Sequence, residues 1–557
     1  MFRRLLLRTA GRLVARPIRR RLNAFVATTH HPETAQSDLL QRIIAKQRDT
    51  GFGRDHGFST IRTVEDFRRQ IPVAPYEYVA PYVQRVQKGE TSALLSDPQV
   101  LMFALTSGTT ASRKMIPITQ DYLDDYRRGW NIWGLTAMRD HPVISLKPMA
   151  QMVGDPEEFR CEAGIPCGNL SGYTAQVQKK IVRGLYTVPA YTGKIKDPVS
   201  RYYVALLCSL RRKVGMLMAA NPSTLVALAR VLDLHKENLL RDLAQGTLSN
   251  NLDIAPELRA ALALRLKADP AQAKKLEAIA QREPVFLPKH VWKPEELMIG
   301  CWTGGSVGPY LRQLPDYYGN TLLRDIGLLA SEGRMTIPLE DNSPAGVLDI
   351  SSHYFEFIPE GEIESKQPIC LRAHELEEGK PYYILLTTKS GLYRYHIVDL
   401  VRMTGKFNGT PLIEFLGKGN RFANLTGEKL SEHHVTQAMI HVMKTIPQPI
   451  TAYALAPVWD EKQPYYGIFL EEQDMKDPVL LASFLKGLEA ELRRQNVEYD
   501  AKRDSGRLGP VQALKISTGA WSRWDKQNLA KRGGSPEQYK HPCLIGDLEF
   551  VKEIEKF

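Results

Sequence analysis

The chain has 557 residues, of which 43% are hydrophobic and 24% charged, a composition typical of a soluble globular protein with more than one domain. Its six cysteines are dispersed without a CxxC pair, which excludes a zinc ribbon or thioredoxin-like centre and favours a reducing, cytoplasmic compartment. The net charge of +12 is concentrated in the first 22 residues, which carry eight arginines and no acid, so we predict no nucleic-acid partner for the nearly balanced remainder.

The basic N-terminal arm, residues 1–24, alternates arginine with leucine, valine and isoleucine. Such a segment is compatible with an amphipathic helix at an anionic lipid surface, with a transit peptide, or with a first helix that packs on the body. No apolar run approaches the roughly 18 residues of a membrane span, and arginines interrupt the apolar segment that a secretory signal needs. Peripheral membrane contact through this arm is therefore an open expectation.

The next part of the chain predicts an α/β body. Residues 36–84 indicate helix and loop, and residues 99–104 (QVLMFA) a short strand before a loop rich in serine and threonine. A helix should follow that loop, with Asp121 as its N-cap. Residues 223–282, rich in alanine and leucine, predict a helical block. Strand-like apolar runs alternate with helical stretches, as in α/β folds, at PVISL (142–146), ELMIGCW (296–302), LRDIGLLA (323–330), GVLDIS (346–351) and YYILLTT (382–388).

After the last of these runs the pattern turns to β-hairpins. The glycine-containing loop at 389–391 separates two apolar runs and predicts a hairpin. A new helix begins at Ser431, and we place a hinge at 425–434. Residues 25–424 then form a large domain, and residues 435–557 a small α+β domain.

The serine- and threonine-rich loop lies in LTSGTTASRKMIP (105–117). Backbone N–H groups and hydroxyls in such a loop between a strand and a helix can cradle phosphate oxygens, and Lys114 would add a positive charge. A polar surface turn is the alternative interpretation. The loop lacks the second glycine of a Walker A motif, and no Gly-x-Gly-x-x-Gly follows a strand, which excludes a P-loop NTPase and a plain dinucleotide-binding domain.

A second glycine-rich segment, Gly304–Gly308, has the Gly-x-Ser-x-Gly pattern of a hydrolase nucleophile elbow centred on Ser306. A strand-like run precedes it, and Pro309 could open a helix. An acid and a histidine would have to follow in that order, and the candidates are Asp349, Asp399, His433 and His434.

Several separated motifs together resemble those of one known family. LTSGTTASRKMIP resembles the phosphate loop of adenylate-forming enzymes, and LASEG (329–333) resembles their second motif. YRYHIVD (393–399) resembles the third motif as the Gretchen Hagen family of acyl-acid amido synthetases has it. Further matches to that family are YFEFIP (354–359), GEK (427–429) and QYKHP (538–542). The order and spacing fit nearly the whole chain beyond the arm, so the chain resembles a bacterial-type member.

The resemblance implies an α/β fold with a large N-terminal adenylate-forming domain, in which helices flank β-sheets beside a β-barrel-like part. A small C-terminal α+β domain would be joined to it by the hinge. The family uses ATP and Mg²⁺ to activate a carboxylic acid as an acyl-adenylate, with release of pyrophosphate. An amine, usually of an amino acid, then attacks to give an amide.

The resemblance also implies roles for individual residues. The residues that bind the nucleotide would be Thr106, Ser107, Gly108, Thr109, Thr110, Gly304, Gly305, Ser331, Glu332 and Asp399. Among them Glu332 would also ligate Mg²⁺, and Asp399 would accept hydrogen bonds from the ribose hydroxyls. Lys429 and Lys540 would be catalytic and stabilise the charge that develops on the in-line phosphoryl group.

The chain departs from the family pattern where Leu328 replaces a tyrosine, His396 an arginine, Val398 a glycine and Cys543 an arginine. Three alternatives stay open: a ligase that passes the acyl group to coenzyme A, a degenerate non-catalytic nucleotide binder, and a serine hydrolase that uses Ser306. Arg127 or Arg128 could pair with the substrate carboxylate, while the aromatic cluster of Tyr126, Trp130 and Trp133 is either an acyl pocket or core.

Overall fold

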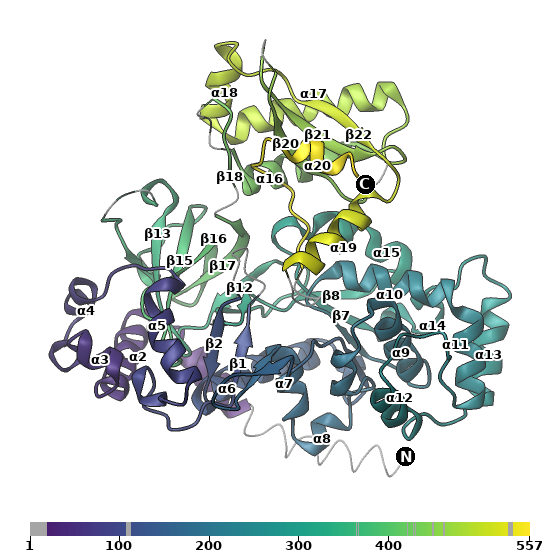
Figure 1. Ribbon diagram of the computed structural model, residues 1–557, viewed down its shortest axis with the longest axis horizontal. Helices are drawn as coiled ribbons and strands as arrows, with labels where there is room; N and C mark the ends of the chain where they lie inside the picture. Colours follow the sequence, from purple (N-terminus) through teal and green to yellow (C-terminus); the bar gives the residue numbers. More distant parts are fainter. Residues whose placement is uncertain are drawn as a thin grey trace.

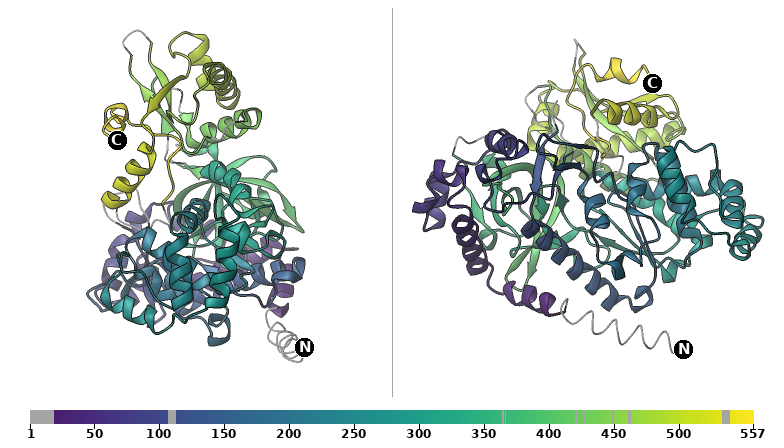
Figure 2. Two further views of the ribbon diagram at one scale, coloured as in Figure 1. Left: turned by 90° about the vertical axis from the view of Figure 1, so that its right-hand side faces the viewer. Right: turned by 60° about the horizontal axis from the view of Figure 1, so that its bottom comes forward.

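The computed structural model describes residues 19–106, 113–363, 365, 367–419, 422–426, 428, 430–447, 450–460, 463–532 and 539–557. A large α/β domain carries a smaller C-terminal domain at one end, seen at the top of Figure 1 and from two further sides in Figure 2. The mixed α/β fold with a large and a small domain is confirmed. In the described part of the chain, no helix combines the length and the apolar character that crossing a membrane requires.

The helical stretches of the large domain form where the sequence predicts them. The first group is α2 (Pro32–Gln47), α3 (Gly51–Asp55), α4 (Val64–Gln70) and α5 (Tyr76–Gln87). The block around 223–282 is α10 (Pro222–Leu234), α11 (Lys236–Gln245), α12 (Pro256–Ala263) and α13 (Pro270–Ala280). Most of these helices bury an apolar face in the cores of the large domain.

A four-stranded parallel sheet in the order β3-β6-β7-β8 lies at the centre of the α/β part. Its strands are β3 (Met149–Gln151), β6 (Met216–Met218), β7 (Met298–Cys301) and β8 (Leu322–Asp325). Helices α9 (Pro198–Leu210), α10 and α15 (Gly308–Tyr318) bury apolar side chains against it. The carboxyl ends of parallel strands in such a sheet are the usual place for a ligand.

A seven-stranded antiparallel sheet takes the place expected for the β-barrel-like part, in the order β11-β12-β17-β16-β15-β13-β14. Its strands are β11 (Thr336–Ile337), β12 (Ala345–Leu348), β13 (Tyr354–Pro359), β14 (Leu371–Arg372), β15 (Pro381–Thr387), β16 (Tyr395–Phe407) and β17 (Thr410–Lys418). The predicted hairpin is the pair β15–β16, and Gly391 in its loop has a φ of +86°, where glycine carries no steric penalty.

The C-terminal domain is α+β, as expected. It contains β20 (Ala454–Val458), β21 (Tyr465–Glu471), β22 (Gln512–Ile516), α16 (Glu432–Val442), α17 (Pro478–Gln495), α18 (Val497–Asp504), α19 (Ala520–Arg532) and α20 (Phe550–Ile554). The three strands form one sheet, and apolar residues of α16 and α17 build a core on it. The hinge and the boundaries 1–24, 25–424, 425–434 and 435–557 stay predictions.

Three local expectations are wrong. The serine- and threonine-rich loop does not lead directly into a helix, because it joins the antiparallel strands β1 (Met102–Leu105) and β2 (Met115–Ile118). Helix α6 (Gln120–Asp140) follows β2, and its N-cap is Thr119, whose hydroxyl accepts a hydrogen bond from the backbone of Tyr122. PVISL begins a 3-10 turn instead of a strand, since Pro142 opens that turn.

Candidate active site

The predicted phosphate loop begins at Thr106, directly after β1. The backbone N–H of Thr106 donates to the carbonyl of Lys114 (3.1 Å), which closes the loop at its base. The Thr106 hydroxyl is buried and has no hydrogen-bond partner among the described residues. Ser107, Gly108, Thr109 and Thr110 lie outside the described residues, so their part in the site stays a prediction.

The second motif lies against the base of this loop. Ser331 Oγ donates to the carbonyl of Leu105 at the end of β1 (3.1 Å). The neighbouring Glu332 is buried, and its Oε1 accepts a hydrogen bond from the Tyr395 hydroxyl (3.1 Å). That hydroxyl in turn accepts one from Lys114 Nζ (3.1 Å). Residues of all three motifs therefore meet at one place.

The electrostatics of this cluster make Glu332 sensitive to nearby cations. Burial raises the pKa of the Glu332 carboxyl, while the positive charges of Lys418 and Lys114 oppose that rise. Burial and the neighbouring Glu332 also raise the pKa of the Tyr395 hydroxyl, which keeps it a hydrogen-bond donor. A buried carboxylate of this kind gains from any further positive charge placed beside it.

Asp399 lies on β16, four residues beyond Tyr395. Its carboxylate forms an ion pair with Lys418, the last residue of the neighbouring β17. His396 is partly buried here, and this burial lowers its pKa to about 4, so the imidazole is neutral near pH 7. The third motif thus brings one acid and one neutral ring to the same site.

The departures from the family pattern have different structural settings. Leu328 is buried in the main core of the large domain, and the Cys543 side chain in the core of the C-terminal domain. Val398, where the family has glycine, adopts a φ of +65°, a left-handed conformation that a β-branched residue rarely takes. The backbone of the third motif therefore keeps the glycine-type conformation without the glycine.

Asp325 ends the parallel strand β8 and is almost fully buried. Its Oδ2 accepts hydrogen bonds from the backbone N–H (2.6 Å) and the hydroxyl (2.8 Å) of Thr303, which follows β7. Burial raises the pKa of Asp325 to about 6, and the charge of Lys540 opposes part of that rise. Asp325 is thus linked to a lysine of the C-terminal domain.

Lys540 extends from the C-terminal domain to the large domain. Its Nζ lies 4.3 Å from the centre of the Trp302 ring and 4.6 Å from that of Phe415, a cation–π arrangement. The preceding residue, Tyr539, accepts a hydrogen bond at its carbonyl from Asn221 Nδ2 (2.8 Å). This places Lys540 at the carboxyl edge of the parallel sheet. Lys429, the other predicted catalytic lysine, lies outside the described residues.

Gly304 and Gly305 follow Trp302 and lie beside the same strand as Phe415. Gly305 has a φ of +69°, and a side chain at that position would meet the Phe415 ring. A β-carbon at Gly304 would crowd the Phe415 carbonyl. Glycine is therefore needed at both positions because the backbone here runs close to β17. Both glycines also lie near Trp302 in the chain, and so beside the site.

The contacts of the predicted acids and histidines do not form a hydrolase triad. Asp349 accepts hydrogen bonds from Arg128 (3.0 Å) and Ser352, and His434 contacts Ser431 and Asn496. Neither Asp349 nor Asp399 is paired with His433 or His434 in the described contacts. The Ser306 side chain is outside the described set.

The helix α6 residues considered for the acid substrate are mostly structural. Arg128 is bound to Asp125 and Asp349, and Arg127 donates to the carbonyl of Val177 (2.7 Å). Trp133 is buried and donates to the backbone of Asp325, so it belongs to the core.

Sequence reasoning missed four site residues: Trp302, Asp325, Phe415 and Lys418. Asp325 could have been found, because an acid at the carboxyl end of a buried parallel strand is a recognised signal. Lys418 and the two aromatic residues carry no such signal, since their place depends on which strands become neighbours in the antiparallel sheet.

A buried carboxylate, a phosphate-loop candidate and an acid on β16 converge in the large domain, and a lysine from a small α+β domain reaches its sheet edge. This arrangement defines an adenylate-forming ligase. Comparison with known protein families then identifies the particular one: the chain belongs to the GH3 family, the Gretchen Hagen family indicated by its motifs. The GH3 family N-terminal domain matches residues 21–323, the central domain 346–418 and the C-terminal domain 432–549.

Individual relatives are similar over nearly their whole length. Jasmonoyl–L-amino acid synthetase JAR6 of Nicotiana attenuata is 24% identical over 92% of this chain and 90% of its own. Probable indole-3-acetic acid-amido synthetase GH3.1 of Arabidopsis thaliana is 23% identical over 95% of this chain and 91% of its own. The solved structure of AtGH3.15 acyl acid amido synthetase in complex with 2,4-DB has a TM-score of 0.82 and 20% identity, covering 97% of this chain and 96% of that one.

The predictions of the family and of the enzyme class are confirmed. The chain is an amido synthetase, an ATP-dependent ligase that adenylates a carboxylic acid and transfers the acyl group to an amine. Jasmonic acid and indole-3-acetic acid, which appear in the names of the relatives, are substrates of those relatives and are not assigned to this chain.

Proposed function

We propose that this amido synthetase adenylates its acid at the junction of the two domains, with Lys540 as the catalytic cation, and conjugates the acyl group to an amino acid. The observation that carries this proposal is the position of the Lys540 ammonium group over the Trp302 and Phe415 rings, close to Asp325. A lysine that enters the site from a separate domain can be withdrawn when that domain rotates. One site would then serve both half-reactions.

In the first half-reaction the substrate carboxylate attacks the α-phosphorus of ATP, and pyrophosphate leaves. Lys540 and Lys429 would stabilise the negative charge that builds on the phosphoryl oxygens, and the loop from Thr106 to Thr110 would hold the triphosphate. The unpartnered Thr106 hydroxyl and the nearby Lys114 support that placement. Asp399 would accept hydrogen bonds from the ribose hydroxyls.

Glu332 fits the role of a Mg²⁺ ligand. It is a buried carboxylate whose pKa is raised by burial, and the charge of a Mg²⁺ ion would stabilise its ionised form. The described residues hold no cluster of three metal-ligating side chains, so the ion would take its remaining ligands from water and phosphate, as Mg²⁺ commonly does. Bound there, the ion would offset the charge of the phosphate oxygens.

In the second half-reaction an amine attacks the acyl-adenylate carbonyl, and AMP leaves. The amino acid acceptor is an inference from the family, and the names of the relatives support it. The six cysteines are all free, which supports the cytoplasmic location expected from the sequence. Residues 1–18 lie outside the described residues, so a membrane contact of the arm stays a prediction.

Pyrophosphate release from Mg-ATP with a pooled panel of carboxylic acids tests the function. We expect acid-dependent release, and an amide product when mixed amino acids are added. A thioester formed in preference when coenzyme A and amino acids are both saturating would identify the acceptor as a thiol. ATP binding without release for any acid would indicate a non-catalytic binder.

Replacing the catalytic lysine tests its role directly. Lys540→Ala should slow acid-dependent pyrophosphate release about 10²–10³-fold, because it removes a cation aimed at the developing charge, while ATP affinity changes little. The matched control is Lys526→Ala, an exposed lysine on α19 of the same domain, which should keep the full rate. Unchanged release in Lys540→Ala would contradict the role.

A further inference from the structure

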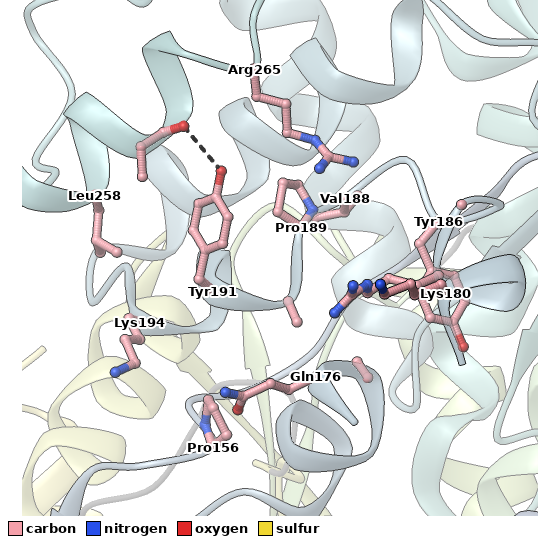
Figure 3. Close-up of a pocket in the computed structure, with 15 residues that line it drawn as sticks. Pro156, Gln176, Lys180, Tyr186, Val188, Pro189, Tyr191, Lys194, Leu258 and Arg265 are labelled. Atoms are coloured by element: carbon pink, nitrogen blue, oxygen red, sulfur yellow. Dashed lines mark hydrogen bonds between the residues drawn. The ribbon is translucent and has the colours of Figure 1, made fainter. Parts of the chain in front are cut away.

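A cavity of about 680 Å³ lies in the large domain (Figure 3). Two helices that line it, α8 (Lys180–Arg183) and α12, lie at the end of the large domain away from the C-terminal domain (Figure 1). The cavity is open to solvent on one side and is lined by residues of α7 (Leu170–Gln176), α8, the 3-10 turn η4 (Ala190–Lys194) and α12. Its size is that of a pocket for a small organic molecule. None of the residues assigned to the nucleotide lines it, so it is distinct from the predicted nucleotide site.

The walls of this cavity are apolar and partly aromatic. Ala175 and Val188 are buried side chains that form part of its floor. Tyr186 and Tyr191 add two rings, and the Tyr191 hydroxyl donates to the carbonyl of Ala261 (3.3 Å), as Figure 3 shows. Because the polar end of Tyr191 is already bonded, its ring is available to an apolar group in the cavity.

The charged residues that line the cavity are all cations: Lys180, Arg183, Lys194 and Arg265. Figure 3 shows Lys180, Lys194 and Arg265 on three different sides of it. No aspartate or glutamate lines the cavity, and within the described ranges none of the four cations forms an ion pair. The nearby Lys196, by contrast, pairs with Asp155 (3.4 Å). The cavity therefore has positive charge around an apolar interior and no counter-charge of its own.

We propose that this cavity binds an organic carboxylate with an apolar body. The body would replace water against the tyrosine rings and Val188, and the carboxylate would meet the cations at the rim. Two arginines can each bind a carboxylate with a pair of parallel hydrogen bonds, whereas a solvated surface lysine alone has little preference. All four cations are exposed to solvent, and they differ from scattered surface charges in that they line one apolar cavity.

The enzyme itself supplies ligands of this class. On the proposed function, its acid substrate is an organic carboxylate, and the amide product keeps the carboxylate of the amino acid. The identification of the ligand as a carboxylate of this kind rests on that function, whereas the anion-binding character of the cavity rests on its lining alone.

Isothermal titration calorimetry of the full chain with saturating AMP tests the site. The probe is 1-naphthalenesulfonate, an apolar anion that cannot be adenylated as a carboxylate is, followed by 1-naphthoate and the neutral 1-naphthylmethanol. We expect one equivalent of each anion to bind, and the neutral compound to bind at least about tenfold more weakly. The double charge reversal Arg183→Glu/Arg265→Glu should weaken anion binding at least about tenfold.

Lys275→Glu, a reversal at an exposed lysine on α13 outside the cavity, should leave binding unchanged. If the double variant does not fold, as judged by circular dichroism, the single reversal Lys180→Glu provides the same comparison. Absence of binding in the presence of AMP, or binding that ignores the reversals, would overturn the site. Binding of the sulfonate without binding of the carboxylate would overturn the assigned ligand class. Pyrophosphate release is measured separately, so failure of the proposed function would show as no release while the sulfonate still binds.

Discussion

Val398 shows how a single residue can depart from a motif without changing the backbone of the site. Its φ of +65° is one that glycine adopts freely and that costs an L-residue roughly 1–2 kcal/mol. The carbonyl of Val398 accepts a hydrogen bond from the backbone of Gly419 (2.8 Å), which holds this conformation in place. The strain lies between the Tyr395 and Asp399 side chains of the site.

Substituting glycine at this position should relieve the strain. We expect Val398→Gly to raise the free energy of unfolding by about 1 kcal/mol, measured by urea denaturation. Val398→Ala keeps a β-carbon in the left-handed region and should gain clearly less. A loss of stability in the glycine variant would mean that packing of the valine side chain outweighs the strain.

Motifs alone could predict which residues lie together in the site, but not which hydrogen bonds and ion pairs these residues form. Ser331, Glu332 and Asp399 were predicted from short patterns, and the structure places the first two beside the base of the phosphate loop. The partner of Asp399 was not predictable, because Lys418 reaches it only through the pairing of β16 with β17. No local sequence pattern indicates which residues of two different strands will lie opposite each other.

At the scale of elements, the sequence predicted the long helices and the β15–β16 hairpin, where the hydrophobic pattern is strong. It failed at the short strand β2. The run MIPI in β2 contains a proline and was assigned to the loop, yet it pairs in register with β1. Tertiary pairing, not propensity, makes this segment a strand.

The start of α6 offers a test of the capping interpretation. The Thr119 hydroxyl is buried and accepts a hydrogen bond from the Tyr122 N–H (3.3 Å). Thr119→Ala should therefore lower the free energy of unfolding by about 1 kcal/mol. Asp121→Ala removes only an exposed ion pair with Lys46 and should cost about 0.5 kcal/mol or less. An equal or larger loss in the aspartate variant, measured by thermal and urea unfolding, would contradict this assignment of the cap.

At the scale of the whole molecule, single hydrogen bonds between described residues join the C-terminal domain to the large domain. Arg312 donates to the Met443 carbonyl (3.4 Å), and Asn221 to that of Tyr539 (2.8 Å). Together with the cation–π contact of Lys540, these bonds can break and re-form without exposing a large core. Such an interface suits a domain that moves between two half-reactions.

Four histidines, of which His353 is buried and the other three partly buried, give the whole molecule a common response to acid. Burial lowers the pKa of His353, His396 and His434 to about 4 and that of His433 to about 3. The unfolded chain therefore takes up protons at these residues as the pH falls below about 6.5, while the folded chain does not. The stability they contribute is complete above pH 6.5 and is lost progressively as the pH falls toward 4.

Acids whose pKa burial raises oppose this trend but do not reverse it. Burial raises the pKa of Asp325 and Asp474 to about 6, so the folded chain holds a proton there that the unfolded chain has released. Burial also raises the pKa of Asp125, Glu332 and Glu360. These five acids offset part of the histidine contribution, and we expect the free energy of unfolding to fall by about 2 kcal/mol between pH 7 and pH 5, measured with urea at each pH. His353→Gln should reduce that fall, because its side chain takes up no proton in either state. If the free energy of unfolding does not change between pH 7 and pH 5, the histidine rings take up protons in the folded chain as well, which would contradict the prediction.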